Sequence, residues 1–269
     1  MKINLNNHNK IKTKKLIVFD LDGTLARTKS PMDSEMANLF EQLLKAKKIA
    51  VVGGGKYEIF QLQLLDELKN AKKLFKNLFI FPTTATAFYL YRNGWKKVYA
   101  LRLSQKEVVK IKNTFEKVFQ EIGYQHPKKT YGELIENRGT QVSFSIYGQD
   151  VVAVLGNKGI RMKEEWKKLH TPTKMKIAKI MSQYLPEFDV KAAGFTTIDV
   201  TKKGIDKAYG LEQIKKHVGI DIKDMLFVGD AIFPGGNDYA VVRTGVDYIP
   251  VTGPEQTKEI IRAVLKGLD

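Results

Sequence analysis

The sequence predicts an α/β protein with a Rossmann-like, mostly parallel central sheet and a second α/β region inserted into it. Three observations predict this fold class. Short continuous apolar runs alternate with helical patterns near both ends of the chain, and each run stops at a polar or glycine-rich loop. Between these two parts, alternating apolar and polar residues replace the continuous runs, as in an antiparallel sheet.

The first half of the parallel sheet should follow a basic segment, residues 1–14, that we expect to be a mobile tail. Apolar runs at 16–19, 49–52 and 78–82 predict buried strands. Apolar residues at three- and four-residue spacing up to Leu44 predict a helix that starts near Asp33 or Ser34. A second such pattern, 59–68, predicts the next helix.

The same alternation returns near the C-terminus. A helix is predicted around 211–218, strands at 225–228 and 248–251, and a last helix from Pro254, because proline is favoured at the first helical position. The segment 141–146 alternates in polarity. We therefore predict a discontinuous core domain over 1–84 and 190–269, interrupted by an α/β cap domain over 85–189.

Composition excludes several classes of protein. The chain has 269 residues and no cysteine, which rules out disulfides, thiolate metal sites and cysteine nucleophiles. No apolar run approaches the roughly 20 residues of a membrane span, and no secretion signal is evident, so we expect a cytoplasmic protein without a membrane partner. The net charge of +16 suggests a polyanionic partner. The lysines are scattered as doublets, however, which disfavours nucleic acid.

Polar side chains follow the predicted strands at the edge where parallel sheets bind ligands. Asp20 and Asp22 follow the first strand, a glycine run begins at Gly53 after the second, and Asp230 follows a later strand, with Asn237 and Asp238 close behind it and Lys207 ahead of it. A single aspartate at a strand end is more often a cap or a turn former. Two acidic loops of this kind instead indicate a site for a hard cation such as Mg²⁺.

These residues resemble a known family. Residues 19–25, Phe-Asp-Leu-Asp-Gly-Thr-Leu, resemble the first motif of the haloacid dehalogenase (HAD) superfamily, and the glycine run, Lys207 and residues 229–238 match its other three motifs in order. The insertion resembles the large cap of the type IIB subgroup. Within that subgroup the sequence is most similar to eukaryotic-type phosphomannomutases, on the segments 51–56, 137–140, 197–200, 204–207 and 229–238.

The resemblance implies a role for each matching residue. Asp20 would be the nucleophile that forms an aspartyl-phosphate, and Asp22 would protonate the leaving oxygen and then activate the acceptor. Lys207 would neutralise the nucleophile and the phosphoryl group. Mg²⁺ would be held by Asp20, the backbone carbonyl of Asp22 and Asp230, with Asn237 and Asp238 supporting the metal site.

The second motif departs from the family pattern. Gly55 stands where the family usually has a serine or threonine whose hydroxyl contacts the phosphoryl oxygens. The backbone N–H groups of Gly53, Gly54 and Gly55 could form an anion-binding nest instead, or the glycines could simply make a tight turn.

The cap departs as well. Arg138 is present, but Ser145 and Asn157 stand where phosphomannomutases have further arginines that grip the distal phosphate. The resemblance still implies four candidate sugar contacts, which are Arg138, Gln141, Thr197 and Asp199. Gln141 and Thr197 could equally be ordinary strand surface.

The resemblance thus implies a Mg²⁺-dependent phosphotransfer enzyme acting on a sugar phosphate or a similar small phosphomonoester. The missing arginines favour a phosphatase, because a mutase must hold its substrate by either end. The alternative is a phosphomannomutase that interconverts mannose 1-phosphate and mannose 6-phosphate. A remote alternative, a nucleic-acid-binding module on a degenerate scaffold, predicts broken motifs, whereas the motif aspartates and lysine are intact. The cap resemblance also implies a homodimer through the inserted domain.

Overall fold

The chain forms two compact units, and the computed structural model describes residues 1–3 and 8–267. One unit comprises Met1–Tyr99 and Asp206–Asp269, and the other comprises Ala100–Ile205. The first unit is therefore discontinuous in sequence. Its boundaries lie about fifteen residues later than the expected 84/85 and 189/190 at both junctions.

The core unit is built on one sheet with the order β11-β10-β1-β2-β3-β4-β5 in the described part of the chain. Neighbouring strands from β11 to β3 are parallel, and β4 pairs antiparallel with β3. The strands are β1 (Leu16–Phe19), β2 (Lys48–Val52), β3 (Leu78–Phe81), β4 (Ala87–Tyr91), β5 (Trp95–Ala100), β10 (Met225–Gly229) and β11 (Asp247–Pro250). The expected parallel strands are all present.

The two unit boundaries differ from the expected ones because of the way the strands pair. Residues 85–99, expected in the cap, supply β4 and β5, which extend the core sheet beyond β3. At the other junction, β8 (Phe188–Ala193) and β9 (Thr197–Lys202), expected largely in the core, pair with each other in the sheet of the inserted unit. The two boundaries therefore lie at 99/100 and 205/206 instead of the expected 84/85 and 189/190.

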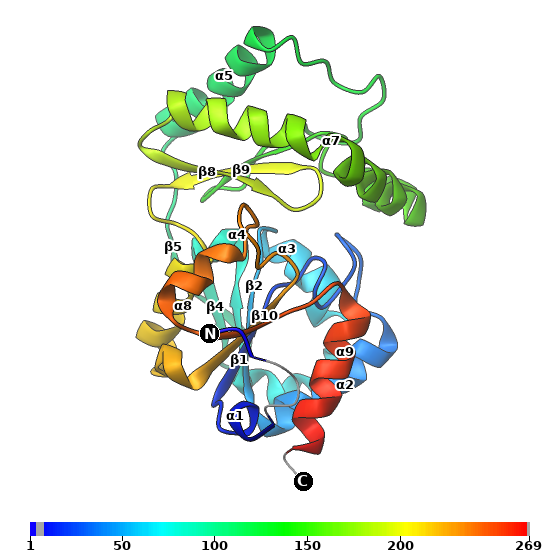
Figure 1. The fold of residues 1–269 in the computed structure, drawn as a ribbon, viewed down its shortest axis with the longest axis vertical. Helices are drawn as coiled ribbons and strands as arrows, with labels where there is room; N and C mark the ends of the chain where they lie inside the picture. Colours follow the sequence, from blue (N-terminus) through cyan, green and yellow to red (C-terminus); the bar gives the residue numbers. More distant parts are fainter. Residues whose placement is uncertain (4–7, 268–269) are drawn as a thin grey trace. The chain divides into compact units, whose positions relative to one another are not determined.

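Helices cover both faces of the core sheet (Figure 1). Successive residues of β1 enter different hydrophobic clusters: Ile17 and Phe19 pack with α2 (Ser34–Ala46) and α9 (Pro254–Lys266), whereas Leu16 and Val18 pack with α8 (Lys207–Val218). This alternation explains why the strands read as continuous apolar runs. The smaller helical elements are α1 (His8–Lys12), α3 (Tyr57–Phe60), the π-helix η1 (Gln61–Leu65), η2 (Lys69–Asn77), α4 (Pro82–Ala85), η3 (Ile222–Asp224) and η4 (Tyr239–Thr244).

The inserted unit is a four-stranded antiparallel sheet in the order β6-β7-β9-β8, over the described residues. It adds β6 (Ile135–Asn137) and β7 (Val142–Ser145) to β8 and β9, with the helices α5 (Gln105–Glu121), α6 (Val151–Leu155) and α7 (Asn157–Tyr184). Alternate strand residues such as Phe144 and Ile198 pack against α5 and α7. The expected alternation at 141–146 is confirmed as β7.

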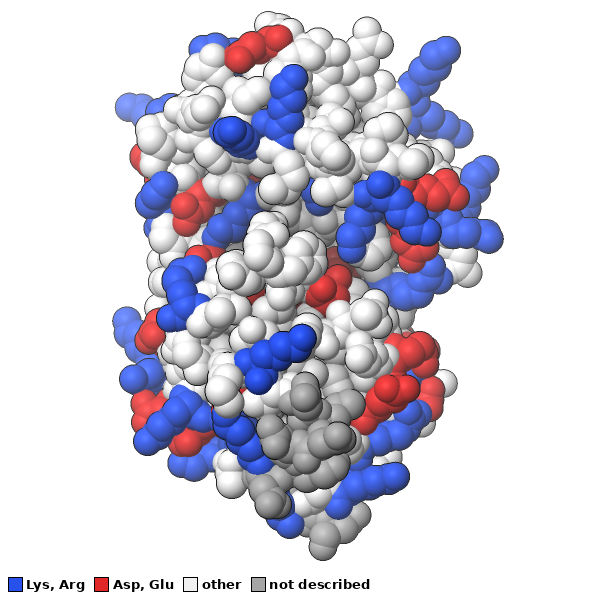
Figure 2. All heavy atoms as spheres, in the orientation of Figure 1, with Lys and Arg blue, Asp and Glu red and all other residues white. Residues whose placement is uncertain are grey.

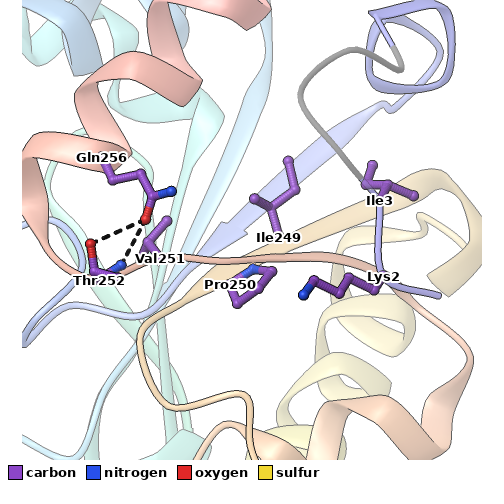
Figure 3. Close-up of a pocket in the computed structure, with 7 residues that line it drawn as sticks. All are labelled: Lys2, Ile3, Ile249, Pro250, Val251, Thr252 and Gln256. Carbon is purple, nitrogen blue, oxygen red and sulfur yellow. Dashed lines mark hydrogen bonds between the residues drawn. The ribbon is translucent and has the colours of Figure 1, made fainter.

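The N-terminal segment differs from the expected mobile tail over its described residues, 1–3 and 8–14. Ile3 N–H donates to Tyr248 O at 3.0 Å, beside a pocket of about 370 Å³ lined by Lys2, Ile3, Ile249, Pro250, Val251, Thr252 and Gln256 (Figure 3). Ile11 is buried, and the Lys14 amine lies 2.6 Å from the Asp247 carboxylate. Hydrophobic burial and ion pairing thus hold the described residues of this segment on the sheet edge.

An ion-pair cluster joins α2 to α9. The Lys258 side chain, only 4% exposed, has its amine 2.8 Å from Asp33 and 2.9 Å from both Glu35 and Glu255. We expect Lys258→Met to lower the free energy of unfolding by about 1 kcal/mol, because the three carboxylates are half exposed or more and water partly compensates them. Urea unfolding followed by circular dichroism measures this loss.

Lys45→Met on α2 is the matched control, because Lys45 makes one exposed pair with Glu41 at 3.3 Å. Its urea midpoint should stay near that of the wild type. Equal midpoints for Lys258→Met and the wild type would show that the cluster adds nothing to stability.

Charged side chains are dispersed on the face shown in Figure 2, where lysines and arginines alternate with acidic and uncharged residues. Among the helices that the structure describes, none combines the length and the apolar character needed to cross a membrane.

Candidate active site

Two strands deliver carboxylates to the carboxyl edge of the core sheet. The wholly buried β1 ends at Phe19, and the next residue, Asp20, continues the pairing through its N–H to Val228 O at 3.0 Å. On the neighbouring strand, β10 ends at Gly229 and Asp230 follows it. Adjacent parallel strands therefore place Asp20 and Asp230 side by side.

Lys207 is the first residue of α8. The helix begins there because the Asp206 side chain caps it, accepting from Tyr209 N–H at 3.0 Å. The Lys207 side chain is buried, and its amine donates to both Asp20 Oδ1 and Asp238 Oδ1. Lys207 is thus held between two carboxylates, one of which is the expected nucleophile.

Burial and neighbouring charges shift the pKa values of Asp20 and Lys207. Burial raises the pKa of Asp20 well above its usual range; the Lys207 charge opposes this shift, while Asp238 and Asp230 reinforce it. For Lys207, burial alone would lower the pKa, but Asp20 and Asp238 outweigh it and the pKa is raised. The lysine therefore stays charged and favours the ionised, nucleophilic form of Asp20.

Asp20, Asp230 and Asp238 form an acidic cluster in which one carboxylate oxygen from each lies within 4.8 Å of the others. Three convergent carboxylate oxygens suit a hard divalent cation. Gly23, with φ of +88°, lets the chain pass this cluster: a Cβ there would lie 2.6 Å from Asp230 Oδ2. The cluster contains Asp238, which the resemblance implied only as metal support.

The Asp22 carboxylate is held by a residue that the sequence reasoning missed. Asp22 Oδ1 accepts from Gln63 Nε2 at 2.9 Å and from the Lys29 N–H at 2.7 Å. Gln63 is fully buried in the π-helix η1, and its amide also donates to Ser30 O at 3.0 Å. The sequence offered no signal that singled out Gln63, because Gln61, Asp66 and Glu67 in the segment 59–68 are also polar.

The glycine run after β2 is partly committed to the sheet. Gly53 N–H donates to Phe81 O at 3.2 Å, so it does not belong to the anion nest that we expected; for Gly54 and Gly55 the nest stays a prediction. The backbone N–H groups of Thr83 and Thr84 donate to Gly55 O and Gly53 O at 2.8 and 2.9 Å. A turn after β3, unnoticed in the sequence, therefore fixes this loop.

The packing around Gly55 leaves little room for a side chain that carries a hydroxyl. A Cβ at this position would lie 2.9 Å from Ile59 Cγ2, so a serine or threonine would require Ile59 to move. This packing is consistent with glycine in place of the usual motif residue.

The loop after Asp230 folds back through its glycines. Gly236 N–H donates to Phe233 O at 2.8 Å, and a Cβ on Gly236 would lie 2.1 Å from Ala231 O. The turn lets Asp238 Oδ2 accept from Ala231 N–H at 3.0 Å and places the half-buried Asn237 next to it. The role of Asn237 as metal support stays a prediction.

In the inserted unit, Arg138 is engaged by its neighbours. Its side chain is 5% exposed, Nε lies 2.8 Å from Glu136 Oε2, and Nη2 donates to Gln149 Oε1 at 2.9 Å. Ser145, at one expected arginine position, is buried and donates to Gly148 O at 2.8 Å. The exposed Asn157 begins α7. Arg138 is therefore a guanidinium in an internal ion pair.

The other cap candidates lie on β9 or beside β7. Ser143 donates to Asp199 Oδ1 at 2.6 Å, and Thr197 donates to Ala193 O at 2.7 Å. Gln141 is buried, and its carbonyl accepts from Arg138 N–H at 2.8 Å. Cross-strand register puts Ser143 opposite Asp199, so this face of the sheet is polar while the other packs on helices. Sugar contacts by Gln141, Thr197, Asp199 and Arg138 stay predictions.

The core unit thus brings together a carboxylate paired with a buried lysine, an acidic cluster and a second, anchored carboxylate. This set can attack a phosphorus atom, neutralise its oxygens and transfer a proton. Asp20, Lys207, Asp230 and Asp238 lie close together.

Comparisons with known proteins agree with this arrangement. Phosphomannomutase from Encephalitozoon cuniculi is 28% identical over 265 residues, covering 95% of both chains, and a probable phosphomannomutase from Caenorhabditis elegans is 27% identical, covering 94% of this chain and 96% of the relative. Among solved structures, truncated IMP-nucleotidase from Plasmodium falciparum superposes with a TM-score of 0.73 at 18% identity, over 99% of this chain and 74% of the other. That likeness shows the fold.

A family model adds the decisive match. The model describes haloacid dehalogenase-like hydrolases and aligns with residues 17–242, which include Asp20, Lys207 and Asp230. With this alignment spanning most of the chain and both units, the protein belongs to the haloacid dehalogenase-like hydrolase family.

Proposed function

We propose that this HAD-family enzyme is a Mg²⁺-dependent phosphatase of a sugar phosphate or a similar small phosphomonoester. The observation that carries the proposal is the pairing of Asp20 with Lys207 beside the acidic cluster, together with a cap arginine committed to Glu136 and Gln149. The paired side chains supply the two groups that phosphotransfer needs, a carboxylate nucleophile and a positive charge. The committed arginine disfavours the two-ended grip on a bisphosphate that a mutase needs.

In the proposed reaction, Asp20 attacks phosphorus and the bond to the leaving oxygen breaks. Asp22 donates a proton to that oxygen and then accepts one from water, which releases phosphate from Asp20. Lys207 favours the ionised form of Asp20 and offsets the phosphoryl charge. Asp20, Asp230 and the Asp22 carbonyl would hold Mg²⁺, which neutralises phosphoryl oxygens when bound.

Phosphomannomutase is the second candidate, because relatives of that name align with 94–95% of this chain. The two candidates share Asp20 chemistry and differ in the acceptor, water or a sugar hydroxyl. Incubation with mannose 1-phosphate, Mg²⁺ and a catalytic amount of hexose bisphosphate separates them. We expect stoichiometric inorganic phosphate; mannose 6-phosphate without free phosphate would establish the mutase instead.

Gln63 should act as a positioning residue for Asp22. Gln63→Leu removes one of the two donors to Asp22 Oδ1, and we expect kcat to fall about tenfold or more, as for a misplaced general acid. The loss should be larger for an alkyl phosphate than for 4-nitrophenyl phosphate, because a phenolate leaves without protonation. Steady-state kinetics on both substrates measure this difference.

Gln61→Leu is the matched control, since Gln61 lies on the same helical turn but is exposed. It should leave both rates unchanged. An equal loss on both substrates in Gln63→Leu would show that Gln63 only supports the fold.

Metal binding should depend on the absence of a side chain at Gly23. Gly23→Ala strains a left-handed residue and drives its Cβ against Asp230, so we expect the Mg²⁺ concentration for half-maximal rate to rise about tenfold. Gly245→Ala is the control, because Gly245 has φ of +75° with no atom within 4 Å of the added Cβ. Similar Mg²⁺ dependence in the two variants would argue against Asp230 as a ligand.

A further inference from the structure

A pocket lined mainly by lysines lies in the core unit, at the amino ends of β1, β2 and β3. Its volume is about 420 Å³, within the range of small-ligand sites. The lining residues are Thr13, Lys14, Lys15, Lys45, Ala46, Lys47, Lys48, Asn77 and Ile220, and this lysine pocket includes no acidic residue. Since Asp20 and Asp230 follow the opposite ends of their strands, the lysine pocket is separate from the candidate active site.

Three of the five lysines have carboxylate partners. The amines of Lys14, Lys15 and Lys45 lie 2.6, 2.8 and 3.3 Å from Asp247, Asp224 and Glu41, in that order. Each of those acids is thereby already engaged. The remaining two amines, on Lys47 and Lys48, have no ion pair within the described residues.

Lys47 is fixed in place without being neutralised. Its amine donates to the backbone carbonyls of Lys12 and Lys14, both at 2.7 Å, so it is ordered but keeps its full charge. Burial lowers the pKa of Lys47, and the nearby Lys12 charge lowers it further. Both effects show that the charged amine is unfavourably placed as long as no anion is near.

We propose that the lysine pocket binds a compact polyanion that carries phosphate groups, such as a di- or triphosphate. Three of the lining lysines lie within four consecutive positions: Lys45 in the last turn of α2, Lys47 as its C-cap and Lys48 at the start of β2. A multiply charged anion relieves the repulsion between them, which a single chloride does less well. The inference is independent of the proposed phosphatase activity.

Titration with inorganic tripolyphosphate in EDTA, at fixed ionic strength, tests the proposal. We expect Lys45→Gln/Lys48→Gln to weaken binding at least about tenfold, because two of the charges that line the pocket are lost. Lys96→Gln/Lys97→Gln removes the same charge from exposed positions on β5 and should bind like the wild type. A parallel titration with adenosine triphosphate shows whether a nucleotide supplies the phosphate chain. Equal affinity for tripolyphosphate in both double variants would overturn the proposal.

Amine labelling locates the anion independently of any variant. Lys47 and Lys48 should react more slowly with an acylating reagent when tripolyphosphate is present, as read by peptide mass spectrometry, while Lys96 and Lys97 react at unchanged rates. Unaltered labelling of Lys47 and Lys48 at saturating tripolyphosphate would place the anion elsewhere. Phosphatase turnover of Lys45→Gln/Lys48→Gln should match that of the wild type, because the lysine pocket lies at the opposite sheet edge.

Discussion

Asp20→Asn should abolish turnover, with a loss of at least about a thousandfold, because an amide oxygen is a poor nucleophile toward phosphorus. The substitution is nearly isosteric and keeps an acceptor for the Lys207 amine. Burial raises the pKa of Asp20, which means that the ionised carboxylate is unfavourable in the folded protein without metal. We therefore expect the melting temperature of Asp20→Asn in EDTA to equal or exceed that of the wild type.

Phosphate release and thermal melting of the same preparation test both halves of this prediction. Asp66→Asn is the matched control, because Asp66 is exposed, and it should keep full activity. An active Asp20→Asn would refute the role of Asp20 as nucleophile, and an inactive but unfolded one would refute the electrostatic account.

Lys207→Met should be both inactive and unstable. The lysine is buried between Asp20 and Asp238, so its removal leaves two carboxylates without their cation. Breaking a buried ion pair in this way costs about 3–5 kcal/mol of unfolding free energy. Turnover should fall at least about a hundredfold, because the ionised form of Asp20 is then less favoured and the phosphoryl charge is not offset.

A second variant separates the two losses. Lys207→Met/Asp238→Asn removes one of the stranded charges, so it should recover part of the stability in urea unfolding without recovering activity. Lys203→Met, at an exposed lysine four residues earlier, should change neither quantity. If Lys207→Met kept wild-type kinetics, the lysine would have no role in phosphotransfer.

The strands could be predicted because their residues are buried on both faces. Each side chain of β1 enters one of two clusters, so the run from Leu16 to Phe19 is apolar without interruption. The N-terminus of α2 was predictable from Asp33, whose side chain accepts from Met36 N–H at 2.8 Å. In both cases the signal in the sequence lies within a few neighbouring residues.

The missed features depend on contacts that are distant in sequence. The assignment of 87–99 to the core requires β4 to pair with β3, which local polarity does not specify. The apolar pattern of 59–68 puts Leu62 on the inward face, but in the π-helix Leu62 is exposed and Gln63 is buried instead. The sequence predicts that Arg138 contacts the substrate. In the structure its guanidinium donates a hydrogen bond to Gln149, eleven residues away.

The central claim is that phosphate passes through a covalent bond to Asp20. Borohydride reduces an acyl-phosphate to an alcohol, so quenching the enzyme with borohydride during turnover marks the phosphorylated carboxylate for peptide mass spectrometry. We predict a single reduced residue at position 20, present only with substrate and Mg²⁺ and absent from Asp20→Asn. Reduction at Asp22, or active turnover with no reduced residue at all, would contradict the account.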